Sequence, residues 1–228
     1  MLFAAAAARD LKAERVGLVA PYLAYMLQDQ RFNPGEAITS NYFATTLSAS
    51  IDWLATVDPH LHRHTSLTEI YSIPTRVVHA APVISDWIRL NIEKPLLIGP
   101  DSESEQWVAA VAAAANAPHL VLEKRRHGDR DVEVSVPEVA RWHDHTPVLI
   151  DDIVSTAHTM IETLSHLKRA RMRPPVCIAA HGIFAGTAFD DLIQAGAIKV
   201  VTTNSIPHRS NEIDLSTLLG FETNQMIM

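Results

Sequence analysis

The chain has 228 residues, of which 47% are hydrophobic and 20% charged, a composition typical of a globular protein with one large domain or two smaller ones. Its net charge of −7 argues against general affinity for nucleic acid or anionic membranes, so any phosphate groups have to be bound by local basic residues. No apolar run approaches the roughly 18 residues of a membrane span, and the single cysteine, Cys177, excludes an internal disulfide and favours a reducing cytoplasm.

A helix is expected at the start of the chain, over residues 1–15. Met1-Leu2-Phe3 and five alanines have the apolar character of a secretory signal, but no basic residues precede them. The charged stretch Arg9-Asp10-Leu11-Lys12 follows directly. We therefore interpret this segment as an amphipathic helix of the folded protein.

From Val16 onward, short β-branched apolar runs alternate with helical patterns of about a dozen residues. The predicted strands are Val16–Ala20, Trp53–Val57, Leu96–Gly99, His119–Glu123, Val148–Ile150, Val176–Ala180 and Ile198–Thr202. The predicted helices are Asn41–Ser50, Pro82–Ile92, Glu103–Asn116, Thr156–Ala170 and Thr187–Ala195. Most of these strands lack polar/apolar alternation, as expected where helices cover both faces of a parallel sheet. The sequence thus predicts an α/β protein whose ligands bind at the carboxyl ends of the strands.

Two segments interrupt the alternation of strands and helices. Residues 28–35 are polar and contain a Pro-Gly turn, and residues 124–131 are highly charged and are expected to form a loop between two strand-like runs. Tyr71–Pro74 is a candidate crossover between two domains. We therefore expect a first unit over residues 1–73 and a second over residues 74–228.

The strongest chemical pattern lies at Pro147–Thr159, where an apolar strand leads to Asp151 and Asp152, a hydroxyl-rich loop and then a helix. Two carboxylates can accept hydrogen bonds from vicinal ribose hydroxyls, and backbone N–H groups at a helix N-terminus can bind a 5-phosphate. The alternative is a strand that ends in an aspartate capping the next helix, which has roughly equal weight from this segment alone. The loop consists of Ser155, Thr156, Ala157, His158 and Thr159.

This segment resembles the phosphoribosyl-pyrophosphate-binding signature of type I phosphoribosyltransferases and synthetases. The matching residues are Asp151, Asp152, Thr156, Ala157 and Thr159. The synthetases usually carry aspartate in place of Ser155 and glycine in place of His158. Serine removes a potential base or ribose contact, and histidine adds a Cβ where close backbone approach is normal.

Several further stretches resemble the ribose-phosphate pyrophosphokinase (phosphoribosyl-pyrophosphate synthetase) family specifically, in the order in which the family carries them. They are Pro21–Ile38, similar to its ATP-site segment; Asp58-Pro59-His60, similar to its Asp-Leu-His motif; Gly99-Pro100-Asp101, similar to its Ser-Pro-Asp; Glu123–Arg126, similar to its catalytic flexible loop; and residues 181–186 and 203–207, similar to its C-terminal landmarks. The resemblance covers nearly the whole chain. It implies two phosphoribosyltransferase-type parallel-sheet units, the first incomplete at its N-terminus.

The resemblance implies a ribose-phosphate diphosphokinase, which transfers the β,γ-diphosphoryl group of ATP to ribose 5-phosphate and forms phosphoribosyl pyrophosphate and AMP. By the resemblance, Asp151 and Asp152 bind the ribose and the Ser155–Thr159 loop binds the 5-phosphate. Gln28 and Asp29 bind ATP, and His60 and Asp101 lie at the metal–pyrophosphate region. The implied catalytic groups are Lys124 and Arg126. The last two would stabilise charge on the transferring group. The alternative for Lys124 and Arg126 is an ordinary solvated run of charge.

Magnesium is the metal that the implied chemistry favours, because Mg²⁺ prefers oxygen ligands and bridges substrate phosphates. His60, His62 and His64 alternate and would share one face of an extended segment, as in a transition-metal site. No cysteine lies nearby. We therefore expect only His60 to have a functional role.

The chain departs from the family pattern at three places. Leu27 occupies the position of an arginine in the ATP segment, and leucine cannot replace a guanidinium. Residues 102–107 replace a pair of glycines. The strands that precede residues 1–15 in the family have no counterpart, so we expect Met1 to be an internal methionine of a longer protein or the gene to be truncated.

Two other functions remain open from the sequence. One is a catalytically weak, synthetase-like regulatory subunit, and the other is a phosphoribosyltransferase that consumes phosphoribosyl pyrophosphate. The expected partners are ATP, ribose 5-phosphate and further copies of the chain in a homo-oligomer, without nucleic acid or membrane. The expected location is the cytoplasm.

Overall fold

The computed structural model describes residues 1–61, 63–100, 104–122, 139 and 141–227, together with the backbone of residues 124–127 and 131–134. Over these residues it shows an α/β protein with two sheets of parallel strands, which confirms the predicted fold class. No helix in the described ranges has both the length and the apolar character needed to cross a membrane.

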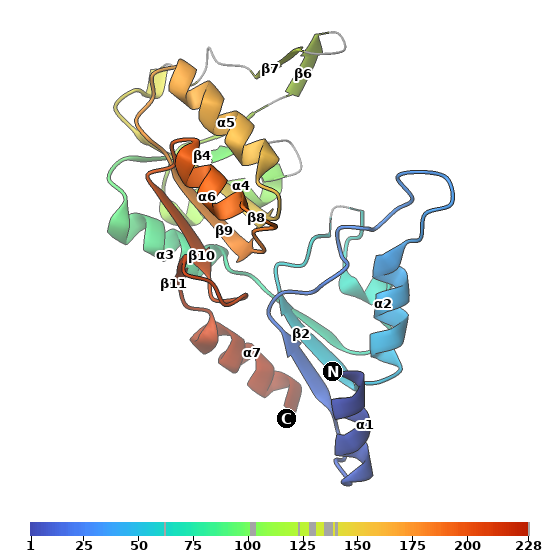
Figure 1. Cartoon of the computed structure of the whole chain (residues 1–228). Helices are drawn as coiled ribbons and strands as arrows, with labels where there is room; N and C mark the ends of the chain where they lie inside the picture. The colour runs from blue at the N-terminus through green and yellow to red at the C-terminus, as the bar shows by residue number, and fades with distance from the viewer. Residues whose placement is uncertain are drawn as a thin grey trace. The chain divides into compact units, whose positions relative to one another are not determined.

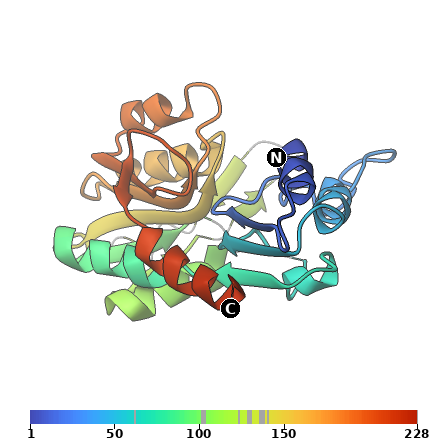
Figure 2. The same ribbon diagram turned by 90° about the horizontal axis from the view of Figure 1, so that it is seen from below.

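The chain folds into two compact units. Unit 1 consists of Met1–His79 and Ser216–Met228, and unit 2 of Ala80–Leu215. This division differs from the expected boundary after residue 73, because strand β3 (Thr75–Val78) pairs with β2 of unit 1. The C-terminal helix α7 (Ser216–Ile227) also returns to unit 1, where it packs against β2 and β3 (Figures 1 and 2).

Unit 1 is built on a three-stranded parallel sheet with the strand order β1-β2-β3. The remaining elements are β1 (Gly17–Ala20), β2 (Trp53–Val57), α1 (Leu2–Asp10), α2 (Thr39–Ser48) and the short 3₁₀ helix η1 (Leu67–Glu69). Every residue of β2 is buried, which explains why the sequence of this central strand shows no alternation. Gly17 is needed on β1, because a Cβ there would lie 1.9 Å from the Trp53 ring. Ala44, Leu47 and Leu54 belong to the core on the α2 side of this sheet.

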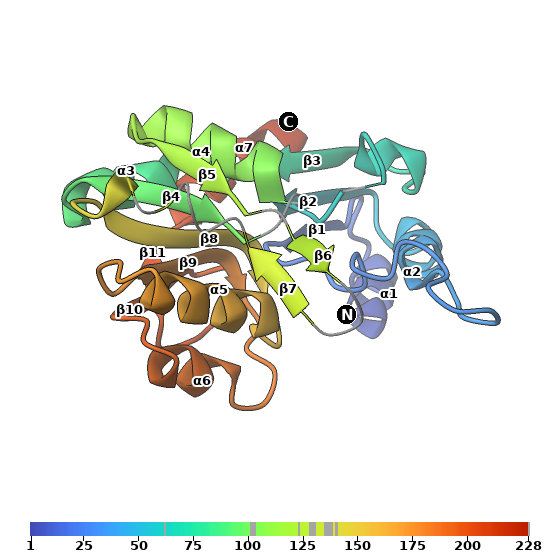
Figure 3. The same ribbon diagram turned by 90° about the horizontal axis from the view of Figure 1, so that it is seen from above.

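Unit 2 is built on a six-stranded parallel sheet with the strand order β11-β10-β9-β8-β4-β5. The strands are β4 (Pro95–Gly99), β5 (His119–Val121), β8 (Thr146–Val154), β9 (Val176–Gly182), β10 (Lys199–Thr203) and β11 (Asn211–Ile213), and the helices are α3 (Ala81–Asn91), α4 (Glu105–Ala115), α5 (His158–Arg169) and α6 (Ala188–Gln194). Helices α3 and α4 cover one face of the sheet, and α5 and α6 cover the other (Figure 3). Two-sided cover places the central strand β8 in the interior, so its carboxyl end is the natural ligand position.

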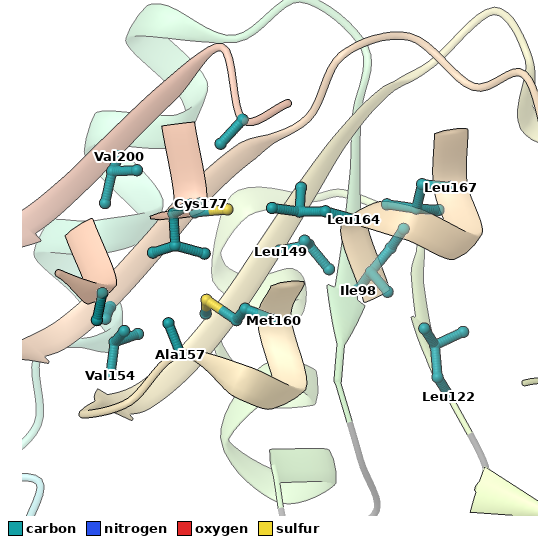
Figure 4. Packing of buried hydrophobic residues seen from close by; sticks show 14 of the residues in the cluster. Ile98, Leu122, Leu149, Val154, Ala157, Met160, Leu164, Leu167, Cys177 and Val200 are labelled. Carbon is teal, nitrogen blue, oxygen red and sulfur yellow. The ribbon is translucent and has the colours of Figure 1, made fainter. Parts of the chain in front are cut away.

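The core between the unit 2 sheet and α5 is densely apolar. Leu149, Met160, Leu164 and Cys177 contribute side chains to it, and each is almost completely buried (Figure 4). Burial raises the pKa of the Cys177 thiol to about 12. A thiol with so high a pKa is a packing group and not a nucleophile.

One predicted loop is replaced by secondary structure. Residues 124–131 were expected to be a charged loop, but β6 (Lys124–His127) pairs antiparallel with β7 (Asp131–Val134) in a two-stranded hairpin. The physical reason is that the β-branched residues Val132 and Val134 favour a strand, and antiparallel pairing satisfies the backbone of both segments. In this register Lys124 pairs with Val134 and Arg126 with Val132.

Candidate active site

Strand β8 carries the Asp151–Asp152 pair to the carboxyl end of the unit 2 sheet. Pro147 to Ile150 are buried between β4 and β9, whereas the two aspartates are only half-buried. Asp151 also accepts a hydrogen bond at Oδ1 from the backbone N–H of Asp152, at 3.0 Å. Both carboxylates thus remain partly accessible near the carboxyl end of a central strand.

The loop after β8 leads into α5 through an unusual backbone conformation. Ala157, with φ of 60°, lies in the left-handed region, which non-glycine residues seldom adopt and which often marks functional loops. His158 is the first residue of α5 and is exposed, so its Cβ is tolerated although the resembling family has glycine there. Among the described residues, no side chain caps this helix.

The absence of a side-chain cap from the described part of the chain argues against the capping interpretation of the Pro147–Thr159 segment. A capping aspartate would accept hydrogen bonds from N–H groups in the first turn of α5. Here the residue before α5 is Ala157, which has no group that can accept them. The first-turn N–H groups and the positive end of the helix dipole are therefore suited to an anion.

The back of this loop is braced by the segment that follows β9. The carbonyl of Val154 accepts hydrogen bonds from the N–H groups of Ile183 and Phe184, at 2.9 and 3.1 Å, and the carbonyl of Ser155 accepts one from Ala185, at 3.0 Å. The carbonyl oxygens of Val154 and Ser155 thus already accept hydrogen bonds from the segment after β9. This arrangement fixes the loop and leaves the exposed side of Thr156 toward solvent.

The C-terminal landmarks of the sequence form a buried polar network. The carbonyl of Ala180 accepts hydrogen bonds from the hydroxyls of Thr203, at 2.6 Å, and Ser205, at 2.9 Å. His181 Nδ1 lies 2.9 Å from Ser205 Oγ, and its side chain is almost completely buried. These residues hold the carboxyl ends of β9 and β10 in position, which gives the landmark pattern a structural role.

Unit 1 carries an aspartate–histidine pair that the sequence pattern did not indicate. Asp58 Oδ1 lies 2.9 Å from His79 Nδ1, and the Asp58 N–H donates to the carbonyl of Val78, at 3.0 Å. The Asp58 side chain is 5% exposed and the His79 side chain 74%. The signal that could have revealed this pair is the register of Val57 with Val78, which places Asp58 and His79 at the same end of adjacent strands.

The contact between Asp58 and His79 should make the stability of the fold depend on pH. The hydrogen bond to Asp58, reinforced by its charge, raises the pKa of His79 despite partial burial. The contribution of the Asp58–His79 contact to the free energy of unfolding is therefore fully present below the unfolded-state pKa of His79. It is lost as pH rises through the folded-state pKa. We expect Asp58→Asn to move the pKa of His79 back toward its ordinary value, as measured by NMR titration of the histidine ring signals. An unchanged titration midpoint would show that the hydrogen bond does not set this pKa.

The polar segment after β1 contains the expected nucleotide residues Gln28 and Asp29. Gln28 Nε2 donates to the carbonyl of Gln30, at 3.1 Å, and the Asp29 carboxylate is paired with Arg63. Glu36 closes the same segment by accepting from the backbone N–H groups of Phe32 and Asn33, each at 3.0 Å. Hydrogen bonds from Asn33, the side chain first, lower the pKa of Glu36. The segment is thus a closed, hydrogen-bonded loop.

The other expected site residues are described only in part. His60 is half-buried and lies two residues beyond Asp58. Asp101 lies outside the described residues, and for Lys124 and Arg126 the description covers the backbone alone. Within the described ranges, no group of three or more His, Cys, Asp or Glu side chains is arranged to hold a metal ion. Mg²⁺ needs no such group, because it commonly binds through one or two protein ligands together with waters and substrate phosphates.

Known proteins resemble this chain in sequence and in fold. A family model described as phosphoribosyl transferase domain matches residues 66–215. The chain is 30% identical to a ribose-phosphate pyrophosphokinase from Sulfurisphaera tokodaii over 90% of the chain and 70% of that protein, and 30% identical to one from Halobacterium salinarum over 94% and 74%. The crystal structure of phosphoribosylpyrophosphate synthetase from Mycobacterium smegmatis superposes with a TM-score of 0.85 at 21% identity, covering 99% of the chain and 76% of that structure.

Proposed function

This chain belongs to the ribose-phosphate pyrophosphokinase family, whose members are enzymes, and we propose that it brings together ATP and ribose 5-phosphate to form phosphoribosyl pyrophosphate and AMP. The observation that carries the proposal is the half-buried Asp151–Asp152 pair followed by the uncapped N-terminus of α5. A sugar with vicinal hydroxyls at one end and a phosphate at the other matches these two features.

The ribose 5-phosphate site is proposed at the carboxyl end of β8. Asp151 and Asp152 accept hydrogen bonds from the ribose hydroxyls, and the loop from Ser155 to Thr159 binds the 5-phosphate. Charge-assisted hydrogen bonds of this kind contribute roughly twice as much as neutral ones. The brace behind the loop supports the proposal, because a fixed loop loses little entropy on binding.

The nucleotide site is proposed in unit 1, on the closed segment that contains Gln28 and Asp29. His60 and Asp101 are proposed to bind the magnesium ion that accompanies the phosphates of ATP. When bound, Mg²⁺ supplies positive charge that offsets the negative charge of the polyphosphate. His60 supports this assignment because it is half-buried near the carboxyl end of β2, where a ligand site is expected.

The reaction is a diphosphoryl transfer. The anomeric hydroxyl oxygen of ribose 5-phosphate forms a bond to the β-phosphorus of ATP and loses its proton. The bond from that phosphorus to the oxygen bridging the α- and β-phosphates breaks, and AMP leaves with the bridging oxygen. We propose that Lys124 and Arg126 stabilise the negative charge that develops on the transferring group.

An assay for AMP tests this function directly. We expect AMP to appear only when ATP, ribose 5-phosphate and Mg²⁺ are all present. Release of pyrophosphate from phosphoribosyl pyrophosphate in the presence of a nucleobase would instead identify a phosphoribosyltransferase. Binding of ribose 5-phosphate without any AMP formation would identify a regulatory subunit, an alternative favoured by Leu27, which is exposed where the family carries a phosphate-binding or stacking arginine.

We also propose that the enzyme acts as a homo-oligomer in the cytoplasm, where its substrates are found. Most of the large apolar side chains that are exposed within the described ranges belong to unit 1. Phe3 and Leu11, for example, are 91% and 84% exposed. Exposed apolar surface of this kind favours association with another chain.

A further inference from the structure

We propose that Arg63 is a nucleotide-binding residue, whose guanidinium contacts the phosphates of ATP and is held in position by the buried carboxylate of Asp29. This inference rests on the proposed use of ATP. It assigns a role to a residue that lies outside every motif in the sequence. It also changes the role of Asp29 from a direct ATP ligand to a positioning residue.

Arg63 and Asp29 come from two loops at the same end of the unit 1 sheet. Asp29 lies in the segment that follows β1, and Arg63 lies in the segment that follows β2. Because β1 and β2 are adjacent and parallel, both segments leave the sheet at its carboxyl edge. Ligands of open parallel sheets bind at this edge.

The contact between the two residues is an ion pair with one buried and one accessible partner. Arg63 Nη1 lies 2.9 Å from Oδ1 and 3.0 Å from Oδ2 of Asp29. The Asp29 side chain is 2% exposed, whereas the Arg63 side chain is 42% exposed. The carboxylate is therefore fixed inside the protein, and it holds a guanidinium that solvent can reach.

Only one of the three guanidinium nitrogens takes part in this pair. An arginine carries five N–H donors, and those on Nε and Nη2 have no acceptor among the described residues. Arg63 Cζ also lies 6.0 Å from the centroid of the Phe32 ring. A guanidinium that is fixed on one side and has donors left on the other is suited to bind a phosphate through two hydrogen bonds.

The surroundings of Arg63 also suit a nucleotide. Phe32, whose ring lies near the Arg63 guanidinium, is 54% exposed, and Tyr25 and Leu27 of the same segment as Asp29 are 57% and 41% exposed. Exposed aromatic and apolar groups beside a cation are the features that bind a base next to its phosphates. Arg63 therefore brings to this segment, from a different loop, the positive charge that Leu27 does not supply.

The competing interpretation is that the ion pair only stabilises the two loops. A half-exposed pair contributes little to stability, but removal of Arg63 would leave Asp29 buried and unpaired, which is costly. A loss of folding alone would therefore not establish binding. The test has to separate affinity for ATP from stability and from affinity for ribose 5-phosphate.

The experiment compares Arg63→Gln and Arg63→Lys with Arg76→Gln. Arg76 is a matched control, because it is also in unit 1, is 40% exposed and forms an ion pair, with Glu222, at 3.1 Å. We expect Arg63→Gln to weaken calorimetric ATP binding about 10- to 100-fold and to raise the KM for ATP by a similar factor. Arg63→Lys keeps one charge but loses the fork of donors, so a smaller loss is expected. The KM for ribose 5-phosphate should stay within about threefold in each variant, and Arg76→Gln should behave as the unchanged protein.

Asp29→Asn and the double variant Asp29→Asn/Arg63→Gln complete the test. If Asp29 acts through Arg63, the double variant should bind ATP no more weakly than Arg63→Gln, because the two losses are not additive. The double variant also removes the unpaired buried charge of Asp29. ATP affinity can therefore be measured in the double variant if Arg63→Gln does not fold. Unchanged ATP affinity in Arg63→Gln or, failing that, in the double variant would overturn the role of Arg63. A wild-type chain that neither binds ATP nor forms AMP would instead overturn the proposed function itself.

Discussion

Replacement of Lys124 by alanine is expected to lower turnover by about 10²- to 10³-fold, while affinity for ribose 5-phosphate stays nearly unchanged. The reason is that a preorganised cation contributes most when negative charge has moved onto the transferring diphosphoryl group. Steady-state kinetics give the turnover number, and calorimetry gives the affinity for the sugar phosphate. In this variant the turnover number should fall, whereas the affinity for ribose 5-phosphate should stay nearly unchanged.

Lys168→Ala is the matched control for this experiment, because Lys168 is an exposed lysine in the last turn of α5. It should keep normal turnover. If Lys124→Ala has near-normal turnover and a raised KM, then Lys124 gathers substrate and does not stabilise the transition state. That result would favour the alternative that Lys124 and Arg126 belong to an ordinary solvated run of charged residues.

Asp151→Asn and Asp152→Asn are each expected to weaken binding of ribose 5-phosphate about 10- to 100-fold while leaving the fold intact. A hydrogen bond to a charged group contributes about 1.5–3 kcal/mol, and each variant removes the charge from one such acceptor. Both aspartates lie at the half-buried end of β8 and outside its apolar core, so the substitutions should not disturb packing. Calorimetry measures the affinity, and thermal unfolding checks the fold.

Asp144→Asn provides the control for the aspartate variants. Asp144 lies shortly before β8 on the chain, is 60% exposed and pairs with Lys94 and His145. Its hydrogen bonds, chiefly with Lys94, lower its pKa to about 2, so it is fully charged at neutral pH. Its removal should leave sugar affinity unchanged. Normal affinity in both Asp151→Asn and Asp152→Asn would contradict the placement of the ribose.

The sequence predicted those parts of the fold whose physical cause is local. The strand Trp53–Val57 was predicted with its observed bounds, because a run of four apolar residues and one threonine without polar/apolar alternation has to be covered on both faces. The strand Val148–Ile150 was predicted for the same reason, but β8 extends over Thr146–Val154 and contains the Asp151–Asp152 pair. The helix predicted over Thr156–Ala170 corresponds to α5, His158–Arg169. Because Ala157 precedes α5 and cannot cap it, the structure favoured one of two interpretations that the sequence had left equal.

Other parts depend on contacts between residues that are far apart in the chain. Asp29 and Arg63 are separated by 34 positions, and nothing in either segment alone indicates that the two side chains meet. His79 gains its partner only because β3 lies beside β2 in register. The hairpin β6–β7 depends on cross-strand pairing that a charged composition conceals. Helix α7 is hard to predict from the sequence pattern, because none of its residues is fully buried. It also packs against strands that lie far earlier in the sequence.

The central claim is that the intact β,γ-diphosphoryl group passes from ATP to ribose 5-phosphate held by Asp151, Asp152 and the loop before α5. The most direct test follows ATP labelled at the β-phosphorus through a reaction with the purified 228-residue protein, ribose 5-phosphate and Mg²⁺. The predicted result is label in phosphoribosyl pyrophosphate, formed in an amount equal to AMP and abolished or strongly reduced by Asp152→Asn. Label in ADP or in inorganic phosphate, with no labelled phosphoribosyl pyrophosphate, would contradict the claim.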